Sequence, residues 1–132
     1  MDLATLTGSC IIALGHLAAA LLANDEGLAS SLEEAGAATG ERVWRFPLWR
    51  DYAKLIEGAH ADLCNVGPPK EAGTIVGACF LKEFVGDTPW AHLDIAGTVH
   101  GVKNVPYLEP KHATGFGVRL LTHWICNLPS NT

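Results

Sequence analysis

Hydrophobic and polar positions along the chain predict strands and helices that alternate. Residues 2–6 alternate between polar and apolar types and include a β-branched residue, which predicts a strand that enters a turn at Thr7-Gly8. Short apolar runs follow over 10–14 and 17–23, separated by Gly15-His16. Their periodicity does not distinguish a buried strand from a buried helix, so both assignments stay open.

Two helices are predicted in the middle of the chain. The first starts at Asn24-Asp25, a typical N-cap, with Glu26 in the first turn where the helix dipole favours an acid. Its apolar face is formed by Leu28, Leu32 and Ala35. We expect this helix to end within 36–40, which begins and ends with glycine. The second helix is predicted over 72–85, where apolar residues recur at offsets of three and four.

The last third of the chain predicts one more strand and one more helix. Over 90–98 the apolar residues at 91, 93 and 95 share one face of a strand, and residues 92, 94 and 96 share the other. A long loop follows to His112, and a final helix begins after Thr114-Gly115. We expect its apolar side to consist of Val118, Leu121 and Ile125.

The order of these elements predicts a layered α/β fold, because the strands are separated in sequence by helices. Composition supports one domain over residues 1–132, which is enough chain for a single core and too little for two. Apolar residues make up 48% of the chain and charged residues only 17%. So few charges favour a piece that buries some of its faces against more protein.

Charge and cysteine content narrow the possible partners and compartment. The net charge is −5 and the nine Lys and Arg residues form no run, which argues against nucleic-acid binding. The four cysteines include no Cys-x-x-Cys pair, so we expect buried, reduced thiols in a cytoplasmic protein. The apolar stretch 3–23 has no positive residues before it and is broken by polar residues and glycines, so no signal peptide or membrane span is predicted.

Candidate catalytic groups do not assemble into a complete site. His92-x-Asp94 on a strand has ligand-like spacing, but a third ligand is not evident, and a hydrogen-bonded histidine beside a structural aspartate is favoured. His60-x-Asp62-x-Cys64 lies in a predicted loop, 61–69, where strand alternation does not apply. Ser9 lacks a Gly-x-Ser-x-Gly context, and no phosphate-binding glycine motif occurs.

Several sequence blocks are informative when they are taken together. The blocks are Asp2-Leu-Ala-Thr-Leu-Thr-Gly8, Asn24-Asp25, Trp44-Arg-Phe-Pro-Leu-Trp49, Ala61-Asp-Leu-Cys-Asn-Val-Gly67, Ala72-Gly-Thr-Ile75, Phe80-Leu-Lys-Glu-Phe84, Trp90-Ala-His-Leu-Asp-Ile-Ala-Gly97 and Thr114-Gly115. In their order and spacing they resemble the leucyl (cytosol) aminopeptidase family, in the C-terminal part of its catalytic domain, over essentially the whole chain. The first and the seventh block at this separation are the most specific. The resemblance implies an α/β/α layered fold with a mixed sheet, of which this chain is a part.

The resemblance also implies a metallopeptidase that releases N-terminal residues, often Leu, from peptides. In such enzymes two divalent ions, Zn or Mn, activate a water and polarise the scissile carbonyl. They are held by a Lys, several Asp and a Glu, and an Arg binds bicarbonate. The signature Asn-Thr-Asp-Ala-Glu-Gly-Arg, with its metal-binding Asp and Glu, has no counterpart here. We therefore expect neither a catalytic nor a metal-ligating residue in this chain, and no activity of the chain alone.

Substrate-binding positions do carry over from the resemblance. The turn with Thr5, Leu6 and Gly8 matches one that binds the peptide main chain and lines the first side-chain pocket. Ala96 and Val99 match further walls of that pocket, and Val66 matches a position against the next substrate residue. Small and branched apolar walls suit a leucine-sized side chain.

These expectations leave two interpretations of the chain. In the first it is a fragment, or truncated product, of an aminopeptidase that assembles as a homo-hexamer when full length. In the second it is a non-catalytic interaction or oligomerisation module derived from the family, which pairs through an exposed sheet edge. A third idea, an independent metal enzyme using His92, Asp94 and His60, is the weakest because those residues do not form a predicted cluster.

Overall fold

The computed structural model of the chain describes residues 1–102, 109 and 111–129. Its elements, in chain order, are β1 (Asp2–Ala4), α1 (Gly8–Leu14), β2 (Ala19–Ala23), α2 (Glu26–Thr39), β3 (Val43–Arg45), α3 (Arg50–Ala53), the 3-10 turn η1 (Lys54–Ile56), α4 (Gly73–Lys82), β4 (Ala91–Asp94) and α5 (Val118–Cys126). Within the described residues the strands form one sheet in the order β1-β4-β2-β3. The sheet is mixed, because β1 runs parallel to β4 and β3 parallel to β2, while β2 and β4 are antiparallel.

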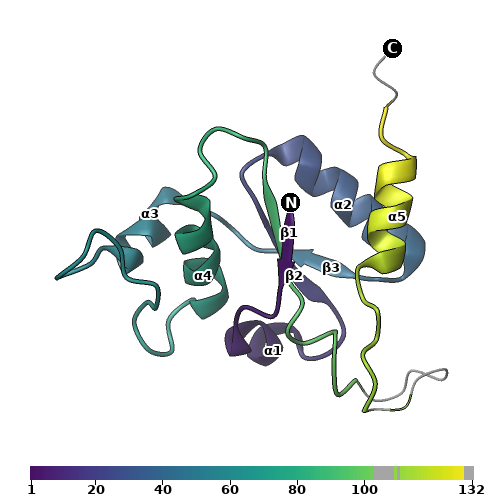
Figure 1. Ribbon diagram of the computed structural model, residues 1–132, viewed down its shortest axis with the longest axis horizontal. Coiled ribbons are helices and arrows are strands. Elements are labelled where there is room, and N and C mark those ends of the chain that lie inside the picture. Colours follow the sequence, from purple (N-terminus) through teal and green to yellow (C-terminus); the bar gives the residue numbers. More distant parts are fainter. Residues whose placement is uncertain (103–108, 110, 130–132) are drawn as a thin grey trace.

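Helices cover both faces of the sheet, which confirms the predicted α/β/α layers (Figure 1). On one face Leu21 and Leu93 pack with Leu32 of α2 and Leu120 of α5. On the other face Leu22 packs in a cluster with residues from α1 and α4. Every residue of β2 and β4 is buried, as expected for central strands that are covered on both sides.

The two undecided apolar runs separate into a helix and a strand. Residues 8–14 form α1, because the Thr7 side chain accepts a hydrogen bond from the Cys10 backbone N–H and caps the helix. Gly15, with φ 62°, ends it. The run over 17–23 contains β2, which occupies the centre of the sheet.

The predicted helix ends agree with the structure to within a few residues. Asp25 caps α2 by accepting a hydrogen bond from the Leu28 N–H at 2.7 Å, and Gly40 ends it in a left-handed conformation. The helix predicted over 72–85 is α4, which is shorter at both ends. The strand predicted over 90–98 ends at Asp94, because the chain turns there through a Thr98 N–H to Ile95 carbonyl hydrogen bond.

Two expectations about burial are wrong in part. The buried side of α5 consists of Leu120 with Leu121 and Trp124, whereas Val118 and Ile125 are exposed. A buried carboxylate in the segment between α2 and β3 fixes this orientation: Glu41 accepts hydrogen bonds from the Gly117 and Leu120 N–H groups at 3.0 and 2.9 Å. All four cysteines are free, as expected, but only two are buried, and Cys64 and Cys126 are exposed.

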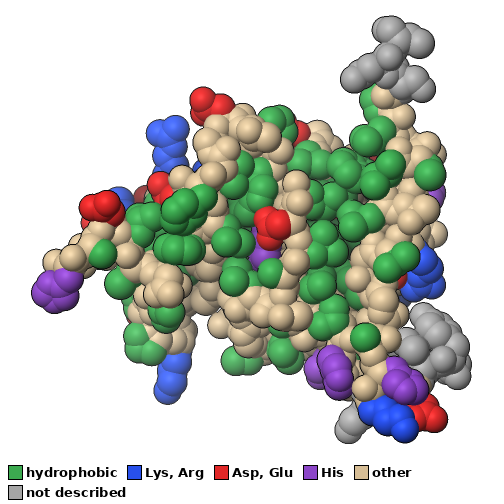
Figure 2. Space-filling model, viewed as in Figure 1, with side chains coloured by type: hydrophobic (Ala, Val, Ile, Leu, Met, Phe, Trp, Pro, Cys, Tyr) green, Lys and Arg blue, Asp and Glu red, His purple; other side chains and the backbone are tan. Residues whose placement is uncertain are grey.

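The surface carries many apolar side chains, in line with the low charged fraction. In the view of Figure 2, hydrophobic side chains gather around β1 and between β1 and α5. Large side chains that are more than two-thirds exposed are Ile12, Leu17, Val66 and Phe84. No helix of the described residues is long and apolar enough to cross a membrane.

Candidate functional site

A buried carboxylate holds the turn between β1 and α1 in one conformation. Asp94, at the end of β4, is 0% exposed. One of its oxygens accepts a hydrogen bond from the Leu6 N–H at 3.1 Å. The other accepts from the Thr7 N–H at 3.1 Å and from the Thr7 hydroxyl at 2.6 Å. These bonds confirm Asp94 as a structural anchor, and they leave Thr5 and Leu6 on the surface.

The same carboxylate reaches the segment that follows β4. The Ala96 N–H donates a hydrogen bond of 3.3 Å to Asp94, and the acceptor is the same carboxylate oxygen that binds the Leu6 N–H. Ala96 is half-buried and packs against the cluster that includes α1. Val99 lies one turn further, where its N–H donates to the Ile95 carbonyl at 3.2 Å. The turn and Ala96 are therefore held by one group, whereas Val99 is outside this network.

His92 belongs to a second network that joins β1 to β4. Its Nδ1 lies 2.6 Å from one oxygen of Asp2, and the Trp90 indole N–H donates to the other oxygen at 2.7 Å. The Trp90 and His92 rings are stacked, with centroids 6.2 Å apart. The expected hydrogen bond of the histidine is confirmed at Nδ1, with Asp2 rather than Asp94 as its partner, whereas Nε2 is buried without a hydrogen-bond partner among the described residues.

No metal centre is formed by the described residues. Among them, no three His, Cys, Asp or Glu side chains lie close enough together to hold a metal ion. His60, Asp62 and Cys64 are all exposed on the loop that follows η1. Burial, with the nearby charge of Asp94, raises the pKa of the Cys10 thiol, so this cysteine stays protonated and is a poor nucleophile.

A cavity of about 300 Å³ lies between the β1–α1 turn, the loop over 65–71 and the start of α4. Its walls include Leu6 and Val66, which come from segments 60 residues apart. Two glycines permit this close approach. A Cβ on Gly67 would lie 2.6 Å from a methyl group of Val76, and a Cβ on Gly77 would lie 2.9 Å from a methyl group of Leu6.

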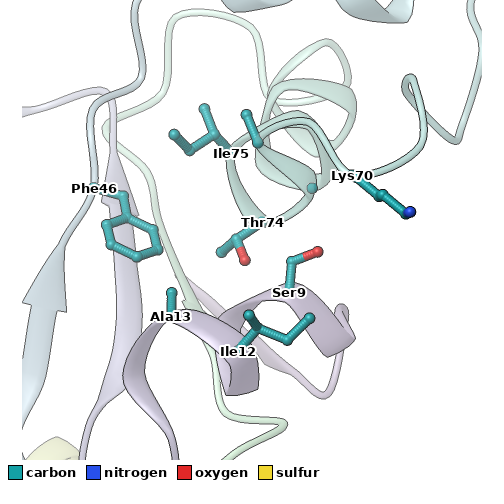
Figure 3. A pocket seen from close by; sticks show the side chains of 9 residues that line it. Ser9, Ile12, Ala13, Phe46, Lys70, Thr74 and Ile75 are labelled. Carbon is teal, nitrogen blue, oxygen red and sulfur yellow. The ribbon is translucent and has the colours of Figure 1, made fainter.

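A second, mostly apolar cavity of about 420 Å³ adjoins the first. Figure 3 shows it between α1, the first turn of α4 and the ring of Phe46. Ser9, Lys70 and Gly73 line both cavities. The Ser9 hydroxyl lies so close to Gly73 that a Cβ there would be 2.3 Å from it. Ser9 is therefore a packing residue at the contact between α1 and α4, as expected for a serine without a nucleophile motif.

The structure brings some of the predicted binding residues together and not others. Leu6 and Val66 share the 300 Å³ cavity, and Leu6 and Ala96 share the Asp94 carboxylate. Gly8 begins α1 at the surface, and a Cβ on it would have no neighbour within 4 Å. Sequence reasoning missed Lys70, which lines the cavity that contains Leu6 and Val66. Its only sequence signal is the Pro-Pro pair just before it, which marks a turn.

Comparison with solved structures shows the class of protein to which this fold and turn belong. A mutant of tomato leucine aminopeptidase superimposes with a TM-score of 0.84 at 42% sequence identity. The match covers 94% of this chain and 23% of the tomato chain. The fold is therefore that of an aminopeptidase domain, in part.

Sequence comparisons identify the family. The model for the catalytic domain of the cytosol aminopeptidase family matches residues 1–122. A probable cytosol aminopeptidase from Geobacter sp. (strain M21) is 53% identical over 125 residues, which is 95% of this chain and 25% of the relative. A probable cytosol aminopeptidase from Geotalea uraniireducens (strain Rf4) is 54% identical over 128 residues, which is 97% of this chain and 26% of the relative. The chain belongs to the cytosol aminopeptidase family, and it spans about a quarter of the length of these relatives.

Proposed function

We propose that this chain forms the substrate-binding part of a cytosol aminopeptidase site that releases N-terminal residues, often Leu, from peptides. The observation that carries the proposal is the surface turn held by Asp94, beside a cavity that contains Leu6 and Val66. A preorganised turn binds a peptide at a low entropic cost, because its backbone is already ordered before the substrate arrives. Membership of the aminopeptidase family supports a peptide as the ligand.

Each predicted binding residue has a role in this proposal. The turn with Thr5, Leu6 and Gly8 binds the peptide main chain and lines the pocket for the first side chain. Ala96 completes that pocket beside the turn, and Val99 extends its wall. Val66, which is 74% exposed, contacts the second residue of the peptide. Main-chain recognition suits this function, because every peptide presents the same backbone groups.

The two divalent ions of the family, Zn or Mn, supply the activated water in a complete enzyme. The described residues of this chain do not fit such a centre, since Asp94 is saturated by backbone and hydroxyl donors and no other cluster exists among them. The proposal therefore assigns the chain peptide binding and orientation, and assigns the metal ligands to the rest of a full-length enzyme. We place that enzyme in the cytoplasm as a homo-hexamer, in which the apolar surface described above is covered.

The proposal is tested by joining this chain to the remaining three-quarters of the Geobacter relative, in place of the matching quarter. The chimera is expected to hydrolyse a leucine anilide when Mn²⁺ or Zn²⁺ is added, and this chain alone is not. The relative without its matching quarter is the control for background activity. A chimera that melts cooperatively and assembles but does not hydrolyse the anilide would contradict the proposal. It would favour the non-catalytic interaction module.

A further inference from the structure

A lysine lies in the cavity that contains Leu6 and Val66. Lys70 comes from the loop over 65–71 and lines the cavity wall. Its ammonium group makes no ion pair with any acidic group of the described residues. Figure 3 shows its side chain pointing away from the neighbouring apolar cavity. This exposed cation, on a cavity wall that also includes Val66, is therefore available to a ligand.

The backbone around Lys70 is held in an uncommon conformation. Lys70 has φ 68° and Ala72 has φ 42°, and they are the two non-glycine residues with positive φ in the described chain. This conformation is unfavourable for residues with a Cβ and persists only where the surroundings enforce it. The Glu71 N–H donates to the Pro68 carbonyl at 3.4 Å across Lys70, and the Val76 N–H donates to the Ala72 carbonyl at 2.9 Å at the start of α4. Lys70 is thus attached to a fixed turn.

We propose that Lys70 binds the free α-carboxylate of the second residue when the substrate is a dipeptide, and so shifts the substrate preference toward dipeptides and away from longer peptides. The inference rests on the proposed function, in which Val66 contacts the second residue. In a dipeptide that residue ends in a carboxylate within the same cavity, whereas in a longer peptide a neutral amide takes its place. A lysine ammonium discriminates between these two groups by charge.

A second charged residue in the cavity allows the role of Lys70 to be tested by the sign of an effect on binding. Glu71 also lines the wall, and its carboxylate repels the anion that Lys70 attracts. Both side chains are exposed, so water screens each interaction to about a fivefold effect on binding. Removing the Lys70 charge should weaken the preference for a free carboxylate, and removing the Glu71 charge should strengthen it. A purely structural role of the loop would not give opposite signs.

The experiment uses the chimera described above and compares kcat/KM for Leu-Ala with kcat/KM for Leu-Ala amide. Lys70→Gln is expected to lower this ratio about fivefold, mainly through KM, while Lys70→Arg keeps it and Glu71→Gln raises it. Added salt should lower the ratio in Glu71→Gln, where only the Lys70 charge acts on the carboxylate, and raise it in Lys70→Gln, where only the Glu71 charge remains. The leucine anilide has no carboxylate, so its hydrolysis should be the same in all four proteins.

The anilide separates failure of this inference from failure of the proposed function. Loss of anilide hydrolysis in the unmodified chimera would contradict the proposed function itself. A full anilide rate with an unchanged dipeptide-to-amide ratio in Lys70→Gln would overturn the role of Lys70. If Lys70→Gln instead lowers kcat/KM for Leu-Asp amide but not for Leu-Ala, the lysine selects an acidic side chain, and the assignment to the terminal carboxylate is wrong.

Discussion

Replacing Asp94 with Asn removes the negative charge that holds the β1–α1 turn while keeping the shape of the side chain. The asparagine amide keeps one acceptor oxygen and places an NH₂ group where the second oxygen accepted hydrogen bonds. Either the Leu6 and Ala96 N–H groups or the two Thr7 donors then face another donor. Because the Asp94 side chain is fully buried, water cannot take the place of its lost acceptor oxygen.

The size of the effect follows from the number of bonds. A hydrogen bond to a charged group contributes about 1.5–3 kcal/mol, and two are lost, with incomplete additivity. We expect Asp94→Asn to lower the free energy of unfolding by about 3–4 kcal/mol, a large share of the ~5–15 kcal/mol of a typical domain. The Leu6 and Thr7 amides should also exchange with deuterium much faster than in the unmodified chain.

Urea unfolding followed by circular dichroism measures the first quantity, and hydrogen exchange followed by NMR measures the second. Asp87→Asn is the matched control, because Asp87 is exposed and makes no side-chain hydrogen bond within the described residues. A loss of less than about 0.5 kcal/mol in Asp94→Asn, the range of ordinary surface substitutions, would refute the idea that this carboxylate organises the turn.

Two further predictions concern other buried groups. Glu41→Gln should lower the free energy of unfolding by about 1–2 kcal/mol in urea melts, because a neutral amide binds the two N–H groups at the start of α5 less strongly. Glu34→Gln, on the exposed side of α2, is the control and should leave the free energy of unfolding unchanged. Burial raises the pKa of the Cys10 and Cys79 thiols above 9.0, so both stay protonated in the folded chain at a pH where unfolded thiols ionise. Their contribution to stability is therefore complete below pH 9.0 and is lost as the pH rises above it, and a Cys10→Ala, Cys79→Ala double variant should show a smaller loss between pH 8 and 10. A thiol reagent at pH 8 should modify the two exposed cysteines and leave these two unmodified, and equal rates at all four would contradict their burial.

The fold class could be predicted because local signals agree with the layers that form. The cap at Asp25, the glycine at 40 and the apolar stripe of α4 are properties of neighbouring residues. The face of α5 could not be predicted in the same way, since apolar residues lie around much of that helix. The Glu41 carboxylate, 76 and 79 residues away from its N–H partners, determines which side turns inward.

Some residues of the candidate site could be predicted from the sequence, and others could not. Leu6 and Ala96 belong to recognisable sequence blocks, and the aspartate between them could be interpreted as an anchor from the sequence alone. The position of Lys70 depends on left-handed backbone at 70 and 72, and no residue pattern predicts that conformation for a lysine and an alanine. The meeting of Leu6 with Val66 depends on two glycine contacts that exist only after folding.

Asp94 binds the backbone of Leu6, which lies 88 positions away in the sequence. This contact limits which substitutions the proposed pocket can accept. A side chain that replaces Leu6 or Ala96, in the wall proposed for the first peptide residue, must still fit against Gly77 or against the core cluster with α1 while its backbone N–H reaches Asp94. Val66 is mostly exposed, so replacements there would alter the wall proposed for the second residue without touching the core. We therefore expect laboratory selection for new peptide preferences to yield variants at 66 and 70 far more often than at 6 and 96.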